Sequence, residues 1–207
     1  MRPLVLLALA LPAVSLAQPS AGVRVGINAS SFLPDLYVAE RVRLAPAAAV
    51  FAEAPVRGRV GVRAEAFYSS EGVNLGPEPA GLFPDYEGGA IRAEYVGVGA
   101  FVSARVPAGG LVLRPYAGPA VAVQVRETHT TRAGGRAWTS RSEFLAPVNA
   151  SAVAGLGVER GRLGLDVRWA LGLDDGYNER HIVRYWGVPK RTSVATLSAT
   201  YRVGGRR

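Results

Sequence analysis

The stretch from Leu163 to Leu173 reads Leu-Gly-Leu-Asp-Val-Arg-Trp-Ala-Leu-Gly-Leu. Every odd position holds a large apolar residue, and the positions between them hold Gly, Ala, Asp166 and Arg168. Successive side chains of a β-strand point to opposite faces, so this spacing predicts a strand with one apolar and one charged face. A helix would spread both classes of residue around its circumference.

The same two-residue period recurs along the chain and predicts eight strands. Arg92 and Glu94 are polar at even positions, whereas Val96 and Val98 are apolar at even positions, which predicts a β-bulge near Tyr95 and Val96. The predicted strands are 23–29, 47–54, 60–68, 91–106, 111–126, 144–158, 163–173 and 195–203.

The connections between these strands alternate in length. Short connections rich in Gly and Pro fit tight turns, and the long ones are polar. Strict alternation is typical of an outer-membrane barrel with short periplasmic turns and long extracellular loops. The fold class that we predict is therefore all-β, an eight-stranded antiparallel transmembrane β-barrel. The short connections are 55–58, 107–110 and 159–161, and the long ones are 32–43, 70–90, 127–142 and 174–190.

A soluble β-sandwich, or a soluble periplasmic or lipocalin-like barrel, gives the same alternation and is the alternative. Two features favour the membrane. The predicted strands reach about 10 residues, the length of a tilted transmembrane strand, and the apolar face carries Tyr68, Trp169 and Tyr201 near strand ends, as an interfacial girdle does. A closed sheet also pairs every backbone polar group within lipid.

The N-terminus has the layout of a secretory signal. A basic start, Met1-Arg2-Pro3, precedes an apolar run at 4–11 and small residues at Ser15 and Ala17. This pattern predicts a signal peptide, 1–17, that is cleaved after Ala17. The apolar run is too short for a transmembrane helix, which takes about 20 residues. We expect residues 18–207 to form a single barrel domain in the outer membrane.

Composition excludes several classes of function. The chain contains no cysteine, so disulfides, thiolate metal sites and cysteine nucleophiles are absent. Its net charge of +8 at pH 7 would suit nucleic acid, but the arginines are spread singly along strands instead of clustering with aromatic residues. We expect a monomer that binds no nucleic acid and no cofactor.

Charged residues on the strand faces opposite the apolar band predict a polar lumen. Side chains just fill the interior of an eight-stranded barrel, so these charges should meet as Arg–carboxylate pairs that plug it. A narrow pore or small-solute transporter is the alternative function. The predicted lumen charges are Arg24, Glu53, Arg63, Glu65, Arg92, Glu94, Arg114, Asp166, Arg168 and Arg202.

An outer-membrane hydrolase is a further alternative. His129 and His181 fall in predicted surface loops, and His181 has Asp174, Asp175 and Glu179 nearby in sequence, as a general base or a Ca²⁺ site requires. No predicted strand places a nucleophile beside them. We therefore expect no catalytic, cofactor-binding or metal residues and a non-enzymatic chain.

The predicted loops 70–90 and 127–142 carry aromatic and arginine residues, among them Trp138, Arg132 and Arg136. Such residues are frequent contact anchors on surface loops. They suggest a structural role or an interaction with a surface or envelope partner. The alternative is that these arginines meet outer-membrane lipid, lipopolysaccharide phosphates or solvent.

Four motifs follow one another along the chain. Residues 22–30 read Gly-Val-Arg-Val-Gly-Ile-Asn-Ala-Ser, residues 63–72 read Arg-Ala-Glu-Ala-Phe-Tyr-Ser-Ser-Glu-Gly, then come Ala117-Gly118-Pro119 and 163–173. Their order resembles the PorT-like outer-membrane β-barrel family, which is common in the Bacteroidetes. The resemblance implies a barrel in the outer membrane. Members named for a role in protein secretion exist, so the resemblance makes a secretion-system protein one candidate partner. Most members have no assigned activity.

Overall fold

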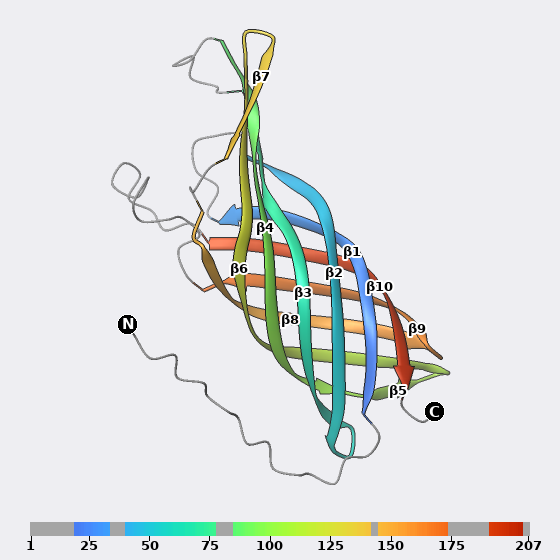
Figure 1. Ribbon diagram of the computed structural model, residues 1–207. Coiled ribbons are helices and arrows are strands. Elements are labelled where there is room, and N and C mark those ends of the chain that lie inside the picture. Colours follow the sequence, from blue (N-terminus) through green and yellow to red (C-terminus); the bar gives the residue numbers. More distant parts are fainter. Residues whose placement is uncertain (1–18, 34–39, 78–84, 142–144, 174–190, 205–207) are drawn as a thin grey trace, which may run out of the picture.

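The computed structural model describes residues 19–33, 40–77, 85–141, 145–173 and 191–204 (Figure 1). The predicted signal peptide, 1–17, and the predicted loop 174–190 lie outside the described residues. Among the described residues, no helix has the length and hydropathy needed to cross a membrane. The strands are β1 (Ser20–Leu33), β2 (Glu40–Arg57), β3 (Val60–Leu75), β4 (Tyr86–Ala104), β5 (Val106–Ala108), β6 (Leu111–Ala133), β7 (Arg136–Arg141), β8 (Val148–Arg160), β9 (Leu163–Gly172) and β10 (Arg191–Gly204).

Eight of these strands form a closed antiparallel ring in the order β1-β2-β3-β4-β6-β8-β9-β10. The pairing of β1 with β10, from Ser20↔Gly204 to Leu33↔Arg191, closes the ring. Strand β5 pairs with the start of β6, and β7 pairs with its end. Closure leaves none of the eight strands with an open edge along the ring. The predicted eight-stranded antiparallel barrel is confirmed.

Burial alternates along the strands with the apolar side chains outside. In β10 the even positions from Thr192 to Arg202 are buried, whereas Leu197, Tyr201 and Val203 are exposed. In β1, Val23, Val25 and Ile27 are likewise exposed. A soluble barrel would bury these residues. The inverted arrangement, apolar outside and polar inside, is the one that a lipid environment requires.

Three tight turns join strands at one end of the barrel, which we call the turn end. Gly58, Gly109, Gly110 and Gly161 lie in these turns and have positive φ. Two successive residues of positive φ, as at Gly109 (54°) and Gly110 (85°), make the hairpin turn whose twist matches that of the flanking strands. The opposite end, which carries the longer connections, is the loop end.

The strands extend further at the loop end than the sequence predicts. Strand β3 runs to Leu75 and β4 begins at Tyr86, within the predicted loop 70–90, and most of the predicted loop 127–142 is a β6–β7 hairpin. In Figure 1 this hairpin and the start of β4 project beyond the ring. Outside lipid the outward face of a strand need not be apolar, so the outward apolar alternation stops while backbone pairing continues.

The predicted phase change within 91–106 is wrong. Ile91, Ala93, Tyr95 and Phe101 are all buried, so β4 keeps one phase from Ile91 to Ser103. The register shift at this level lies on the partner strand: Glu94 pairs with Arg126 and Tyr95 pairs with Gln124, which leaves Val125 as an extra residue in β6. The bulge therefore belongs to β6.

Candidate functional site

The interior of the barrel holds a cluster of ion pairs centred on Glu65 of β3. The two oxygens of this carboxylate accept from Arg24 Nη2 of β1 at 2.5 Å, from Arg63 Nη2 at 2.8 Å and from Arg168 Nη1 of β9 at 2.6 Å. Asp166 of β9 lies beside them, with its Oδ1 3.6 Å from Arg24 Nη1. We call these five buried residues the central cluster.

Aromatic rings complete the surroundings of the central cluster. Tyr116 Oη donates to Asp166 Oδ1 at 2.9 Å. The guanidinium of Arg63 lies 4.0 Å from the Phe51 ring centroid and 4.8 Å from that of Tyr116, and Arg168 lies 5.3 Å from the Phe67 ring. Three arginines against two carboxylates leave one excess positive charge, and the ring faces provide negative potential for it.

A second cluster of charges lies nearer the turn end. Arg114 of β6 donates to Glu53 Oε1 at 2.7 Å and to Glu159 Oε2 at 2.6 Å. Arg202 of β10 donates to the same two carboxylates, at 3.2 Å to Glu53 Oε2 and 2.7 Å to Glu159 Oε1. Arg202 Nη1 also donates to Ser20 Oγ at 2.7 Å. Two arginines and two carboxylates make this turn-end cluster electrically balanced.

Glycines on neighbouring strands make room for the interior aromatic rings. Gly22 pairs with Phe51, Gly97 with Phe67, and Gly155 with Tyr116. A Cβ added to Gly22 or Gly155 would lie 2.4 Å from the facing ring, and one added to Gly97 would lie 2.6 Å from Phe67. Each ring therefore lies over the backbone of a glycine, a cross-strand pairing that stabilises sheets.

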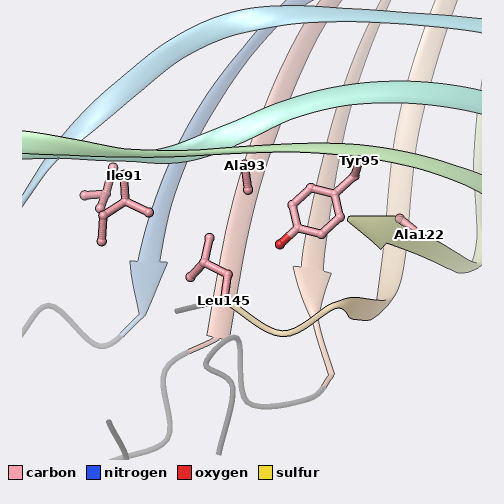
Figure 2. Close-up of a cluster of buried hydrophobic side chains, with 6 residues drawn as sticks. Ile91, Ala93, Tyr95, Ala122 and Leu145 are labelled. Carbon is pink, nitrogen blue, oxygen red and sulfur yellow. The ribbon is translucent and has the colours of Figure 1, made fainter. Parts of the chain in front are cut away.

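An apolar group covers the loop end of the interior (Figure 2). Leu145 comes from the segment between β7 and β8 and packs inside the barrel near Ile91 and Tyr95 of β4. The backbone N–H of Leu145 donates to Glu127 Oε2 at 3.1 Å. A small cavity with room for about one water lies beside Leu145 and Tyr95. Side chains thus fill the described interior at three levels.

Most of the predicted lumen charges face the interior. The prediction is wrong for Arg92 and Glu94, which lie on the outer wall. There Arg92 Nη2 is 2.6 Å from Glu94 Oε1, and the Arg92 side chain is 44% exposed. Their outward position follows from the unbroken phase of β4 from Ile91 to Ser103, which lacks the bulge predicted near Tyr95 and Val96. The charges that face the interior are Arg24, Glu53, Arg63, Glu65, Arg114, Asp166, Arg168 and Arg202.

Sequence reasoning missed Glu159 and Phe51. Glu159 was assigned to a turn, but it belongs to β8, which begins at Val148 and not at residue 144. It shares the odd parity of Asn149 and Ser151, and that parity alone would have placed it inside. Phe51 shares the parity of Glu53, and its ring lies between Arg63 and Arg202, with the Arg202 guanidinium 5.0 Å from the ring centroid.

The residues of the hydrolase alternative are not brought together in the described part of the chain. His129 lies in β6, half-buried and opposite Ile91 and Ser140, instead of in a loop. His181, with its neighbours Asp174, Asp175 and Glu179, falls outside the described residues. Within the described ranges no group of three or more His, Asp or Glu residues is placed to hold a metal ion.

Residues 16–178 match the model of a family described as outer membrane protein beta-barrel domain. The chain belongs to this family, and its members reside in the bacterial outer membrane. The turn end is thus the periplasmic side and the loop end the outer side. Within this family, the PorT-like assignment stays a prediction. No curated protein matches the chain.

Solved structures with similar folds come from several bacteria. Ail, the attachment invasion locus protein of Yersinia pestis, in complex with the heparin analogue sucrose octasulfate, is 13% identical, with 89% of this chain and 99% of that chain covered and a TM-score of 0.47. Neisserial surface protein A is 9% identical, with 88% and 96% covered and a TM-score of 0.42. The N-terminal β-barrel domain of Pseudomonas aeruginosa OprF is 10% identical, with 88% and 97% covered and a TM-score of 0.38.

Proposed function

We propose that the protein is a non-conducting, non-enzymatic membrane anchor that holds a β-sheet at the cell surface for contact with an envelope or surface partner. The observation that carries this proposal is the filled interior: charged clusters occupy the lumen, while the start of β4 and the β6–β7 hairpin project beyond the ring (Figure 1). The proposal includes export of the chain with removal of residues 1–17.

The filled interior supports a closed barrel. The side chains of Arg24 and Glu65 are 3% and 0% exposed, and Glu65 binds three arginines drawn from β1, β3 and β9. An ion that crossed this level would have to displace several short ion pairs in a low-dielectric interior, where the partners left behind are strongly destabilised. The central cluster therefore links β1, β3 and β9 through ion pairs inside the lumen.

The start of β4 and the β6–β7 hairpin form a projecting sheet, which we call the platform. The backbone N–H groups of Gly134 and Gly135, in the β6–β7 turn, donate to Asp85 O at 3.0 Å and to Glu87 Oε1 at 2.7 Å. These bonds tie the hairpin to the start of β4. Trp138 of β7 is 52% exposed on this platform. Exposed Trp and Arg are the residue types that most often anchor protein contacts.

The resemblance of four sequence motifs to PorT-like proteins supports an envelope partner connected with protein secretion. In this proposal the partner binds the platform from outside, and the barrel contributes position and rigidity. The narrow pore, the alternative role, requires a conducting path through the clusters described above.

Planar-bilayer recording tests the closed barrel. Because the central cluster fills the lumen, we expect the purified full chain to give no steady single-channel steps. A variant with Arg24→Ala and Arg168→Ala should conduct, and the control with Arg57→Ala and Arg59→Ala, which removes two exposed charges at the turn end, should not. If the wild type gives steady steps and their size changes in the Arg63→Ala variant, ions pass through the central cluster. That result would contradict the proposal.

Site-specific photo-crosslinking tests the platform. A photoreactive amino acid in place of Trp138, in cells that express the full chain, should give a discrete product of higher mass. The same amino acid in place of Arg57, exposed at the turn end, should not give that product. If positions 136, 138 and 140 all give no product while the protein reaches the outer membrane, the partner role of the platform is wrong.

A further inference from the structure

Arginines gather on the outer wall of the barrel where the apolar band ends. The register places Glu94 of β4 beside Arg126 of β6, and in the next row Arg92 beside Thr128, which in turn lies beside Arg141 of β7. These residues therefore form two adjacent rows across three strands. We call Arg92, Arg126, Thr128 and Arg141 the wall patch.

Burial of the neighbouring residues establishes which way the wall patch faces. Ala93 and Tyr95 are buried, so Arg92 and Glu94 between and beside them point outward. Glu127 is buried, so Arg126 and Thr128 on either side of it point outward too. The wall patch is thus on the lateral surface, the surface that faces lipid further down the same strands.

The apolar band begins directly below the wall patch. On β4 the next outward residues are Val96 and Val98, and on β6 they are Val121, Val123 and Val125. These valines are 43% to 57% exposed. On β6, Arg126 directly follows Val125, and on β4, Glu94 and then its ion-pair partner Arg92 lie above Val96. Such a boundary lies where lipid acyl chains give way to headgroups.

The charge at this boundary is strongly positive. Glu94 is the carboxylate within the two rows, and it is paired with Arg92. Arg126 and Arg141 have no ion-pair partner in the part of the chain that the structure describes. Arg43 of β2 adds a further positive charge near Arg92 and Glu94. Exposed guanidinium groups and the Thr128 hydroxyl remain available to an anionic ligand.

We propose that the wall patch binds the phosphate of an anionic glycolipid in the outer leaflet, whose acyl chains cover the valines below. Planar guanidinium groups bind phosphate through paired hydrogen bonds, and a hydroxyl adds a further donor. A lipid satisfies both halves of this surface, because one molecule carries phosphate above and hydrocarbon below. The wall patch also faces sideways into the bilayer and not outward from the hairpin tip, where a soluble anion would bind.

Glycolipid retention by the purified full chain tests the proposal. The chain, folded in detergent micelles, is incubated with a phosphorylated lipid A or with the same lipid after phosphatase treatment, and bound lipid is counted by native mass spectrometry. We expect about 10-fold or greater preference for the phosphorylated form, since removing the phosphate removes its charge-assisted hydrogen bonds to the guanidinium groups. The triple variant Arg92→Gln, Arg126→Gln and Arg141→Gln should lose this preference.

A matched control separates a specific site from general attraction. The triple variant Arg57→Gln, Arg59→Gln and Arg105→Gln removes the same charge from exposed positions at the turn end and should keep the wild-type preference. Equal losses in both triple variants, or equal retention of the two lipids by the wild type, would overturn the proposal. Should the first triple variant fail to fold, the single change Arg126→Glu replaces it and should still reduce the preference several-fold.

Discussion

Replacing Glu65 with alanine is expected to lower the free energy of unfolding by about 3–5 kcal/mol, the usual cost of removing one partner from a buried ion pair. Glu65 accepts hydrogen bonds from Arg24, Arg63 and Arg168, and its side chain is fully buried. The variant would leave three guanidinium groups in the lumen with Asp166 as the nearby carboxylate. The measurement is urea-dependent unfolding in lipid vesicles, followed by tryptophan fluorescence.

The control for this prediction is Glu94→Ala on the outer wall. Glu94 also pairs with an arginine, at 2.6 Å, but the side chain of its partner Arg92 is 44% exposed. Exposed pairs contribute about 0–1 kcal/mol, so this variant should unfold almost as the wild type does. Similar losses in Glu65→Ala and Glu94→Ala would show that the central cluster does not stabilise the barrel as argued.

The number of strands and their order were predictable because lipid imposes a simple rule on each strand. Outward positions must be apolar, and inward positions cannot all be, so the two-residue period survives in every membrane-crossing segment. The stretch from Leu163 to Leu173 shows this rule in its simplest form. The rule stops at the loop end, which is why the β6–β7 hairpin was predicted as a loop.

Most of the lumen charges were predictable for the same reason, since parity relative to the apolar residues decides the face. Arg92 and Glu94 show the limit of parity. They lie above the apolar band, where the apolar residues of β4, Ile91, Ala93 and Tyr95, face inward and the charged residues face outward. The sequence also does not reveal which of two paired strands carries a bulge. The extra residue is Val125 in β6, and it changes nothing in the phase of β4.

The pairing of charges across the lumen was not predictable from the sequence. Glu65 binds Arg24, 41 residues away, and Arg168, 103 residues away, and neither arginine belongs to a strand adjacent to β3 at that point. Which side chains meet depends on the stagger of all eight strands around the ring. Sequence alternation gives the face of each residue but not this stagger.

Replacing Gly155 with alanine is the second change expected to have a large effect. The added Cβ would lie 2.4 Å from Cζ and 2.5 Å from Oη of Tyr116, so the ring must move. Overpacking of this kind costs about 1–3 kcal/mol. Displacement of Tyr116 would also weaken its 2.9 Å hydrogen bond to Asp166, and bonds to charged groups contribute about 1.5–3 kcal/mol. We expect a total loss of about 3 kcal/mol in the same unfolding measurement.

Gly157→Ala is a matched control on the same strand and the same face. A Cβ at Gly157 would have its nearest neighbours, Arg114 Cβ and Asp166 Oδ2, at 3.6 Å, which is ordinary contact. Since glycine in a strand costs about 0.5–1 kcal/mol relative to alanine, this control should unfold at the same or a slightly higher urea concentration. Adding Tyr116→Ala to Gly155→Ala should remove most of the steric penalty, as coupled neighbours do. If Gly155→Ala and Gly157→Ala have the same free energy of unfolding, the packing of the Tyr116 ring does not depend on the absence of a Cβ at position 155.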